Sequence, residues 1–107
     1  MNTNKHYIKI INNIQSNKPV VIDTRFINNT YIYDISNFIK THNNFSYLSI
    51  KDKSELNFEE NAYKQLFNTL GHCNSLQTFK FKCIYDNCLY FNELINMLKN
   101  NISIKNL

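Results

Sequence analysis

Glycine and proline are almost missing from this chain of 107 residues, which has one of each, Gly71 and Pro19. A single glycine excludes the glycine-rich loops that cradle phosphate groups, because such loops need several glycines close together. Tryptophan is absent, and arginine occurs once, at Arg25. No stretch approaches the roughly 18 apolar residues that a membrane-spanning helix requires. We therefore expect neither a phosphate-binding loop nor a membrane span.

Cysteine is scarce, and its three copies are not spaced as a disulfide framework. His72, Cys73, Cys83 and Cys88 form the one metal-like grouping in the sequence. A strand between Cys73 and Cys83 would hold them roughly 20 Å apart, which is too far for two ligands of one ion. We therefore expect no metal, no other cofactor and reduced thiols inside a cell.

The first residues, Met1 to His6, lack the apolar core of a secretion signal. Together with the odd number of cysteines, this predicts a cytoplasmic protein. For a viral or microbial effector, that cytoplasm would be the host's.

Charge is only mildly biased, with 12 Lys and Arg against 8 Asp and Glu, a net charge of +4. No run of basic residues occurs, so nucleic-acid binding is the weaker alternative. We place His6, His42 and His72 at the edge opposite the carboxyl ends of the strands. No nucleophile or paired-carboxylate spacing accompanies them. We expect no catalytic residues and no enzyme activity.

An apolar pattern that recurs four times is the main feature that the sequence does contain. Its internal spacing is x, x+3, x+4, x+10, x+13 and x+15, and the units are 28, 31 and 28 residues apart. The first three positions follow the helical period and the last two follow the strand period. Each unit is therefore predicted to form a helix, a short turn and a strand. The second unit shows the pattern best, with Ile35, Phe38, Ile39, Phe45, Leu48 and Ile50.

The predicted elements alternate along one domain, 1–107, of about 3.5 repeats. The predicted helices are 6–16, 34–41, 62–70 and 92–99, and the predicted strands are 20–25, 46–51, 77–83 and a last one from about 102. We expect Asp34 and Asn92 to begin their helices as N-caps, residues 26–33 to form a loop or a ragged strand end, and Gly71 to adopt a left-handed turn. Strands joined by helices predict an α/β fold with a parallel sheet, right-handed crossovers and helices on one side.

Two of these segments, Phe45 to Ile50 and Leu76 to Phe81, resemble the LxxLxL core of leucine-rich repeats. The segment from Leu94 to Leu107 resembles the helix-to-strand half of that repeat, and the 28-residue step is similar to the ribonuclease-inhibitor-like subclass. The resemblance implies a short, uncapped β/α solenoid that recognises other proteins. An inhibitor or effector role is a further hypothesis, which the resemblance itself does not imply. The chain lacks the family's Asn or Cys after each strand, near Arg25, Lys53 and Ile84.

Residues between the strand anchors should point to the uncovered face of the sheet. The partner-binding candidates on this face are Tyr47, Ser49, Lys51, Thr78, Lys80 and Lys82. Their lysines predict an acidic protein partner, with Asp23 offsetting the charge of a neighbouring lysine. Two alternatives stay open: nucleic acid bound by the same Lys and Tyr side chains, and a homodimer formed through a free strand edge.

Overall fold

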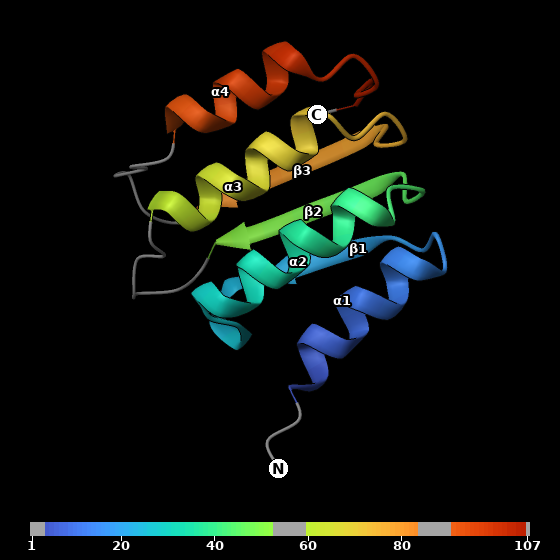
Figure 1. Ribbon diagram of the computed structural model, residues 1–107, viewed down its shortest axis with the longest axis vertical. Coiled ribbons are helices and arrows are strands. Elements are labelled where there is room, and N and C mark those ends of the chain that lie inside the picture. Colours follow the sequence, from blue (N-terminus) through green and yellow to red (C-terminus); the bar gives the residue numbers. More distant parts are fainter. Residues whose placement is uncertain (1–3, 53–59, 84–90, 107) are drawn as a thin grey trace.

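The computed structural model describes residues 4–52, 60–83 and 91–106 of the chain. Helices and strands alternate through these ranges, and Figure 1 shows the four helices on the same side of a parallel sheet. The elements are α1 (Lys5–Gln15), β1 (Val20–Asp23), a 3-10 turn η1 (Thr24–Phe26), α2 (Asn29–Thr41), β2 (Tyr47–Asp52), α3 (Glu60–Gly71), β3 (Thr78–Cys83) and α4 (Phe91–Asn100). The predicted α/β class and parallel sheet are confirmed.

The strands pair in the order β1-β2-β3. Val20 pairs with Leu48, and Leu48 pairs with Phe79. Beyond β3, Thr78 forms an isolated parallel bridge with Asn106. These pairings step along the chain by 28, 31 and 28 residues, the spacing of the sequence repeat. The predicted register is therefore confirmed, while the right-handed solenoid remains a prediction.

The core lies between the helix layer and the covered face of the sheet. Ile22 and Ile50 are fully buried on that face of the sheet. Ile35 of α2 and Leu66 of α3 are fully buried on the helix side of the core. Each such side chain stabilises the fold by about 1.5–3 kcal/mol relative to an exposed one. The apolar anchors of α4 are less enclosed: only Met97 is buried there, and Leu94 and Leu98 are partly exposed.

The second helix begins five residues before its predicted start. Asn28, not Asp34, is its N-cap, and the Asn28 side chain accepts a hydrogen bond from the Tyr31 N–H at 3.2 Å. The prediction of a loop over 26–33 was therefore wrong from Asn29 onward. Ile32 is fully buried and extends the apolar face of α2 by one turn. The predicted cap Asn92 was also wrong, because it lies inside α4.

Serines in the helix-to-strand turns connect neighbouring units. The Ser103 hydroxyl lies 2.9 Å from the carbonyl oxygen of Cys73 and 2.6 Å from that of Leu76. Ser75, which is 28 residues earlier, donates in the same way to the carbonyl oxygen of Phe45 at 2.7 Å. The last two of these turns are thus each hydrogen-bonded to the turn before them.

The chain's single glycine does not provide a left-handed turn, contrary to the prediction. Gly71 is the last residue of α3 and has no positive φ. Among the described residues other than glycine, only Asn17 has a positive φ, of 53°. Gly71 instead lies where α4 passes close to α3: a Cβ there would be 3.6 Å from the Asn100 Cβ.

Candidate partner-binding face of the sheet

The uncovered face of the sheet brings the six predicted partner-binding residues together in three rows. Tyr47 pairs with Thr78, Ser49 with Lys80, and Lys51 with Lys82. β1 extends the last two rows with Val21 and Asp23. The predicted placement on adjacent strands is confirmed, although partner binding itself is a separate question.

Exposure divides these six residues into two groups. Lys51, Lys80 and Lys82 are exposed, and Tyr47 and Thr78 are half-buried. Ser49 is only 8% exposed, because its short side chain lies in a row between Val21 and the long side chain of Lys80. The prediction that Ser49 offers a contact surface is therefore weakened. The exposed functional groups of this face are mainly the ammonium groups of its lysines.

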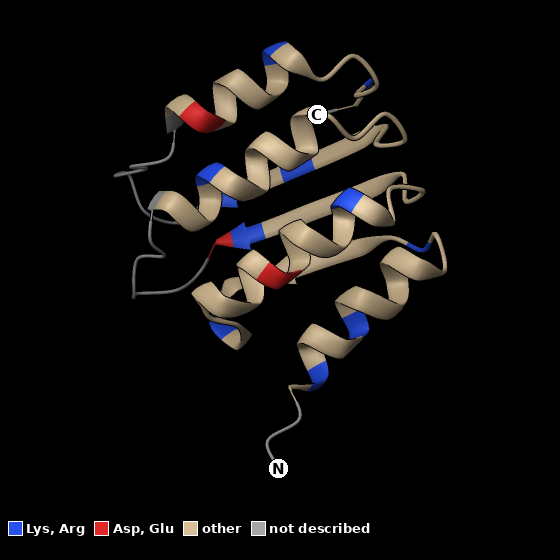
Figure 2. Ribbon diagram, viewed as in Figure 1, with Lys and Arg blue, Asp and Glu red and all other residues tan. Residues whose placement is uncertain are grey.

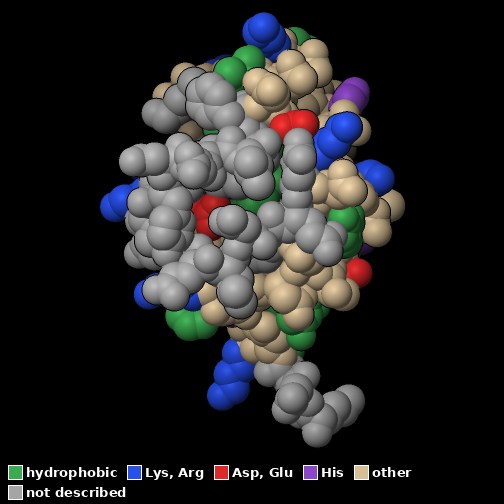
Figure 3. Space-filling model, turned by 90° about the vertical axis from the view of Figure 1, so that its left-hand side faces the viewer, with side chains coloured by type: hydrophobic (Ala, Val, Ile, Leu, Met, Phe, Trp, Pro, Cys, Tyr) green, Lys and Arg blue, Asp and Glu red, His purple; other side chains and the backbone are tan. Residues whose placement is uncertain are grey.

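The lysines of this face have no ion-pair partner among the described residues. Asp23 shares a row with Lys51, but its carboxylate accepts hydrogen bonds from Arg25 instead, at 2.7 Å from Nη2 and 3.0 Å from Nε. This hydrogen bond raises the pKa of Arg25 above its usual value. Asp23 is the neighbour of Lys51 in the sheet, as predicted, and it also forms an ion pair with Arg25. Lysines stand on β2 and β3 in Figure 2, and basic side chains project around the outline in Figure 3.

Tyr47 and Lys80 contact each other across the two strands. The Lys80 ammonium lies 5.8 Å from the centre of the Tyr47 ring, within the range of a cation–π interaction. Thr78, in the same row as Tyr47, accepts a hydrogen bond from the Asn106 amide at 3.3 Å. These contacts hold Lys80 over the face of the sheet and occupy one side of the tyrosine ring.

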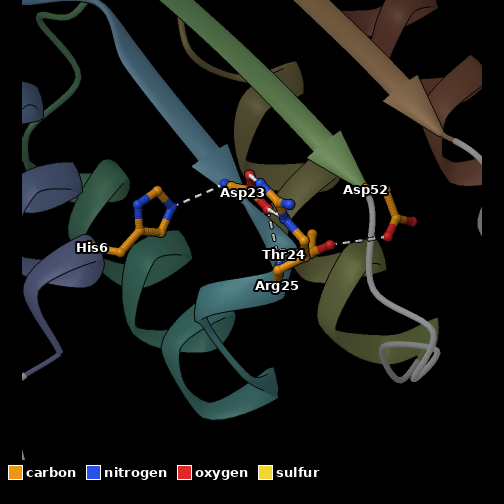
Figure 4. Close-up of polar contacts among 5 residues, drawn as sticks. All are labelled: His6, Asp23, Thr24, Arg25 and Asp52. Atoms are coloured by element: carbon orange, nitrogen blue, oxygen red, sulfur yellow. Dashed lines mark hydrogen bonds and ion pairs between the residues drawn. The ribbon is translucent and has the colours of Figure 1, made fainter.

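A polar cluster at the carboxyl ends of β1 and β2 was missed by the sequence analysis (Figure 4). The His6 Nε2 atom accepts a hydrogen bond from the Asp23 N–H at 2.9 Å, and the Thr24 hydroxyl donates to the Asp52 carboxylate at 3.2 Å. His6 was predicted at the opposite edge, and that prediction was wrong. A histidine that starts a helix gives no sequence signal of which strand end it will reach.

The hydrogen bonds of this cluster connect α1 to the end of β1, and the residue after β1 to the end of β2. The His6 Nε2 atom must be unprotonated to accept the hydrogen bond from the Asp23 N–H. Burial lowers the pKa of His6 below 6.5; the charge of Asp23 acts against this shift, and the charge of Lys9 adds to it. Asp23 is held by Arg25, and Thr24 connects β1 to the end of β2. The acceptor of His6 and the carboxylate of Asp23 are thus both engaged in contacts within the fold.

Metal ligands were predicted to be absent, and the cysteines bear on that expectation. Cys73 is a free thiol, 2% exposed. The Cys83 side chain and the whole of Cys88 lie outside the described part of the structure. Among the residues that are described, no three His, Cys, Asp or Glu side chains gather closely enough to hold a metal ion.

In the described ranges, no helix combines the length and the apolar character needed to cross a membrane. Comparisons with known protein families, with curated proteins and with solved structures give no match.

Proposed function

We propose that this chain is a non-catalytic protein-binding module whose uncovered sheet face accepts an acidic surface of another protein. In this proposal the repeats form a short right-handed solenoid similar to leucine-rich repeats, acting as a cytoplasmic inhibitor or effector. The observation that carries the proposal is that Lys51, Lys80 and Lys82 are exposed and form no ion pair within the described ranges, while Asp23, in the row of Lys51 and Lys82, pairs with Arg25. Complementary charge accelerates association and selects partners.

The arrangement of side chains on the face also supports this proposal. Adjacent parallel strands present their side chains in regular rows, and the Tyr47 ring lies in the end row beside the charge of Lys80. Tyrosine is enriched in protein interfaces, whereas lysine is depleted in their cores, so in this proposal the lysines act at the charged rim and select the partner by its charge. A partner's carboxylates would meet lysines on two neighbouring strands at once.

Nucleic-acid binding is less favoured by the position of Tyr47. Bases stack on exposed aromatic faces, whereas Tyr47 is half-buried and one of its faces is occupied by Lys80.

Edge pairing into a homodimer also receives little support at β1. His6 occupies the Asp23 N–H, and Pro19 precedes the strand without a donor of its own.

The test is capture of partners from nuclease-treated lysate by the wild-type chain and by a variant carrying Lys51→Glu, Lys80→Glu and Lys82→Glu. We expect the variant to lose the captured protein. The matched control carries Lys5→Glu, Lys40→Glu and Lys99→Glu, an equal change of charge on exposed helix positions, and should retain it. Unchanged capture by the first variant would refute the proposal. Loss of all capture on nuclease treatment would favour the nucleic-acid alternative, which also predicts a steep salt dependence.

A further inference from the structure

A groove of about 660 Å³ runs between α3 and α4, in the helix layer opposite the uncovered sheet face. This volume lies within the range of sites that bind ligands, roughly 300–1,000 Å³. Phe67 and Met97 line the groove but are almost completely inaccessible, and the accessible walls mix polar groups with apolar surface. Gly71 also lines the groove, and it contributes no side chain where α3 passes close to α4.

Asparagine side chains stand on both walls of the groove. Asn61 and Asn68 come from α3, and Asn96 and Asn100 from α4. All four residues are exposed, and no other described residue engages their side-chain amides. Gln65, between the two asparagines of α3, is held by a hydrogen bond to Asn37 of α2 at 3.2 Å. The walls therefore present hydrogen-bond donors and acceptors, few of which are already used by hydrogen bonds within the protein.

Glu93 gives the groove a negative charge that the fold does not satisfy. Its Oε2 atom is inaccessible to solvent and meets no hydrogen-bond donor among the described residues. A buried polar atom without a partner is costly, and such atoms are uncommon in folded proteins. Lys64 also lines the groove, but no ion pair joins it to Glu93. Glu93 as a whole is only half-buried and lines the groove, so a rotation of its side chain would bring the carboxylate to a ligand's cation and relieve this cost.

The amides and their spacing fit an extended peptide. Each asparagine amide has one acceptor and one two-hydrogen donor, the complement of a peptide bond's N–H and C=O. Asn96 and Asn100 lie four residues apart in α4, about 6.0 Å along the axis, close to the two-residue repeat of an extended chain at about 6.6 Å. A peptide lying along the groove could thus present its backbone to successive amides.

We propose that the groove between α3 and α4 binds an extended peptide segment with a basic side chain that pairs with Glu93. The asparagines hold the peptide backbone without regard to its sequence, and Glu93 selects arginine or lysine at one position. This site is separate from the uncovered sheet face and does not depend on its function. Its target is basic, whereas the partner proposed for the sheet is acidic.

The test compares two capped tetrapeptides, acetyl-Ala-Arg-Ala-Ala-amide and the same peptide with neutral citrulline in place of arginine. Binding is followed through the NMR signals of the asparagine side-chain amides. We expect the arginine peptide to bind about tenfold more tightly, because its hydrogen bonds to Glu93 are charge-assisted. Glu93→Gln should abolish this preference. Lys64→Gln should increase it, since Lys64 competes for the same carboxylate.

The matched control is Asp34→Asn, which removes one exposed negative charge from α2, outside the groove. It should keep the tenfold preference, as should the variant with three glutamates on the sheet face. Equal binding of the two peptides, a preference that survives Glu93→Gln, or no binding at millimolar peptide would each overturn the proposal. Failure of partner capture by the sheet face would leave this result unaffected, so the two proposals fail separately.

Discussion

Asp23 and Arg25 are two residues apart and form an ion pair of 2.7 Å at the end of β1. The pair determines the electrostatics of the uncovered sheet face. The strand register places Lys51 beside Lys82 in one row, and Asp23 in the same row is hydrogen-bonded to Arg25. Like charges in adjacent positions are unfavourable for the sheet. The face therefore carries a small cost in stability that a partner's carboxylates would remove.

Lys82→Glu should stabilise the isolated protein while weakening its partner binding. The substitution replaces a repulsion with an attraction to Lys51 in the same row, worth about 0.2–1 kcal/mol. Urea unfolding measures the change in stability, and capture of the partner measures the change in binding. Lys99→Glu, at an exposed position of α4, is the control and should alter neither strongly. A destabilised Lys82→Glu protein would show that this repulsion is absent.

The stability of the fold should decrease as the pH falls below about 6.5, the usual pKa of histidine. Burial lowers the pKa of His6 in the folded state, so below that value the unfolded chain binds more protons than the native one and unfolding becomes easier. Above pH 6.5 both states are neutral, and the hydrogen bond from the Asp23 N–H is fully kept. Urea unfolding between pH 7.5 and 5 measures this dependence.

His6→Gln provides the control for this pH dependence. The glutamine carbonyl can accept the same N–H without titrating, so the slope of stability against pH should become shallower. His42 is exposed at the end of α2, and His42→Gln should leave the slope close to that of the wild type. An unchanged slope in the His6→Gln protein would show that another group dominates the acid sensitivity.

Much of the fold could be predicted from the sequence because its apolar anchors repeat. Ile22, Ile50 and Phe81 occupy one row of the sheet, as their equal positions in the repeat require. The start of α2 could not be predicted as well. Both Asn28 and Asp34 are acceptable N-caps, and the choice between them depends on burial of Ile32 against the rest of the core, a tertiary effect.

The candidate site was predictable in its rows but not in its electrostatics. Alternation along a strand is sufficient to place Lys51, Lys80 and Lys82 on one face. The pairing of Asp23 depends on the 3-10 turn after β1, which brings Arg25 back over the strand end. The position of Glu93 in a groove could not be predicted from the sequence either, because the groove forms only when α3 and α4 pack together.

Gly71→Ala should be tolerated or should stabilise the protein, although Gly71 is the only glycine of the chain. It lies in α3 without a positive φ, and an added Cβ would meet its neighbours at ordinary contact distances of 3.6–3.8 Å. An alanine in a compatible conformation stabilises a protein by about 0.4–1 kcal/mol, because it restricts the unfolded chain. Thermal unfolding measures the effect.

The matched comparison for Gly71→Ala is Asn17→Ala, at the residue whose φ is 53°. A left-handed conformation costs an ordinary residue about 1–2 kcal/mol, and asparagine tolerates it better than alanine does. Asn17→Ala should therefore destabilise the protein, and Asn17→Gly should not. If Gly71→Ala proved the more damaging of the two alanine variants, the close packing of α4 on α3 would need revision.

Ser103→Ala should loosen the last unit of the repeat more than it lowers global stability. The Ser103 hydroxyl contacts the turn before it through the carbonyl oxygens of Cys73 and Leu76, and its loss should cost about 0.5–1.5 kcal/mol. The following segment holds the edge of β3 through a hydrogen bond from the Phe79 N–H to the Asn106 carbonyl oxygen, at 2.9 Å. Two of the α4 anchors, Leu94 and Leu98, are only partly buried, so this unit should open before the rest of the sheet.

Amide hydrogen exchange separates this local opening from global unfolding. In the Ser103→Ala protein, the Phe79 N–H should exchange faster, while amides of β2 that pair with β1 keep their protection. Ser16→Ala, at the exposed end of α1, is the control and should stay within about 0.5 kcal/mol of the wild type. Equal acceleration at Phe79 and in β2 would mean that the units unfold together and that the serine contact does not hold the last one separately.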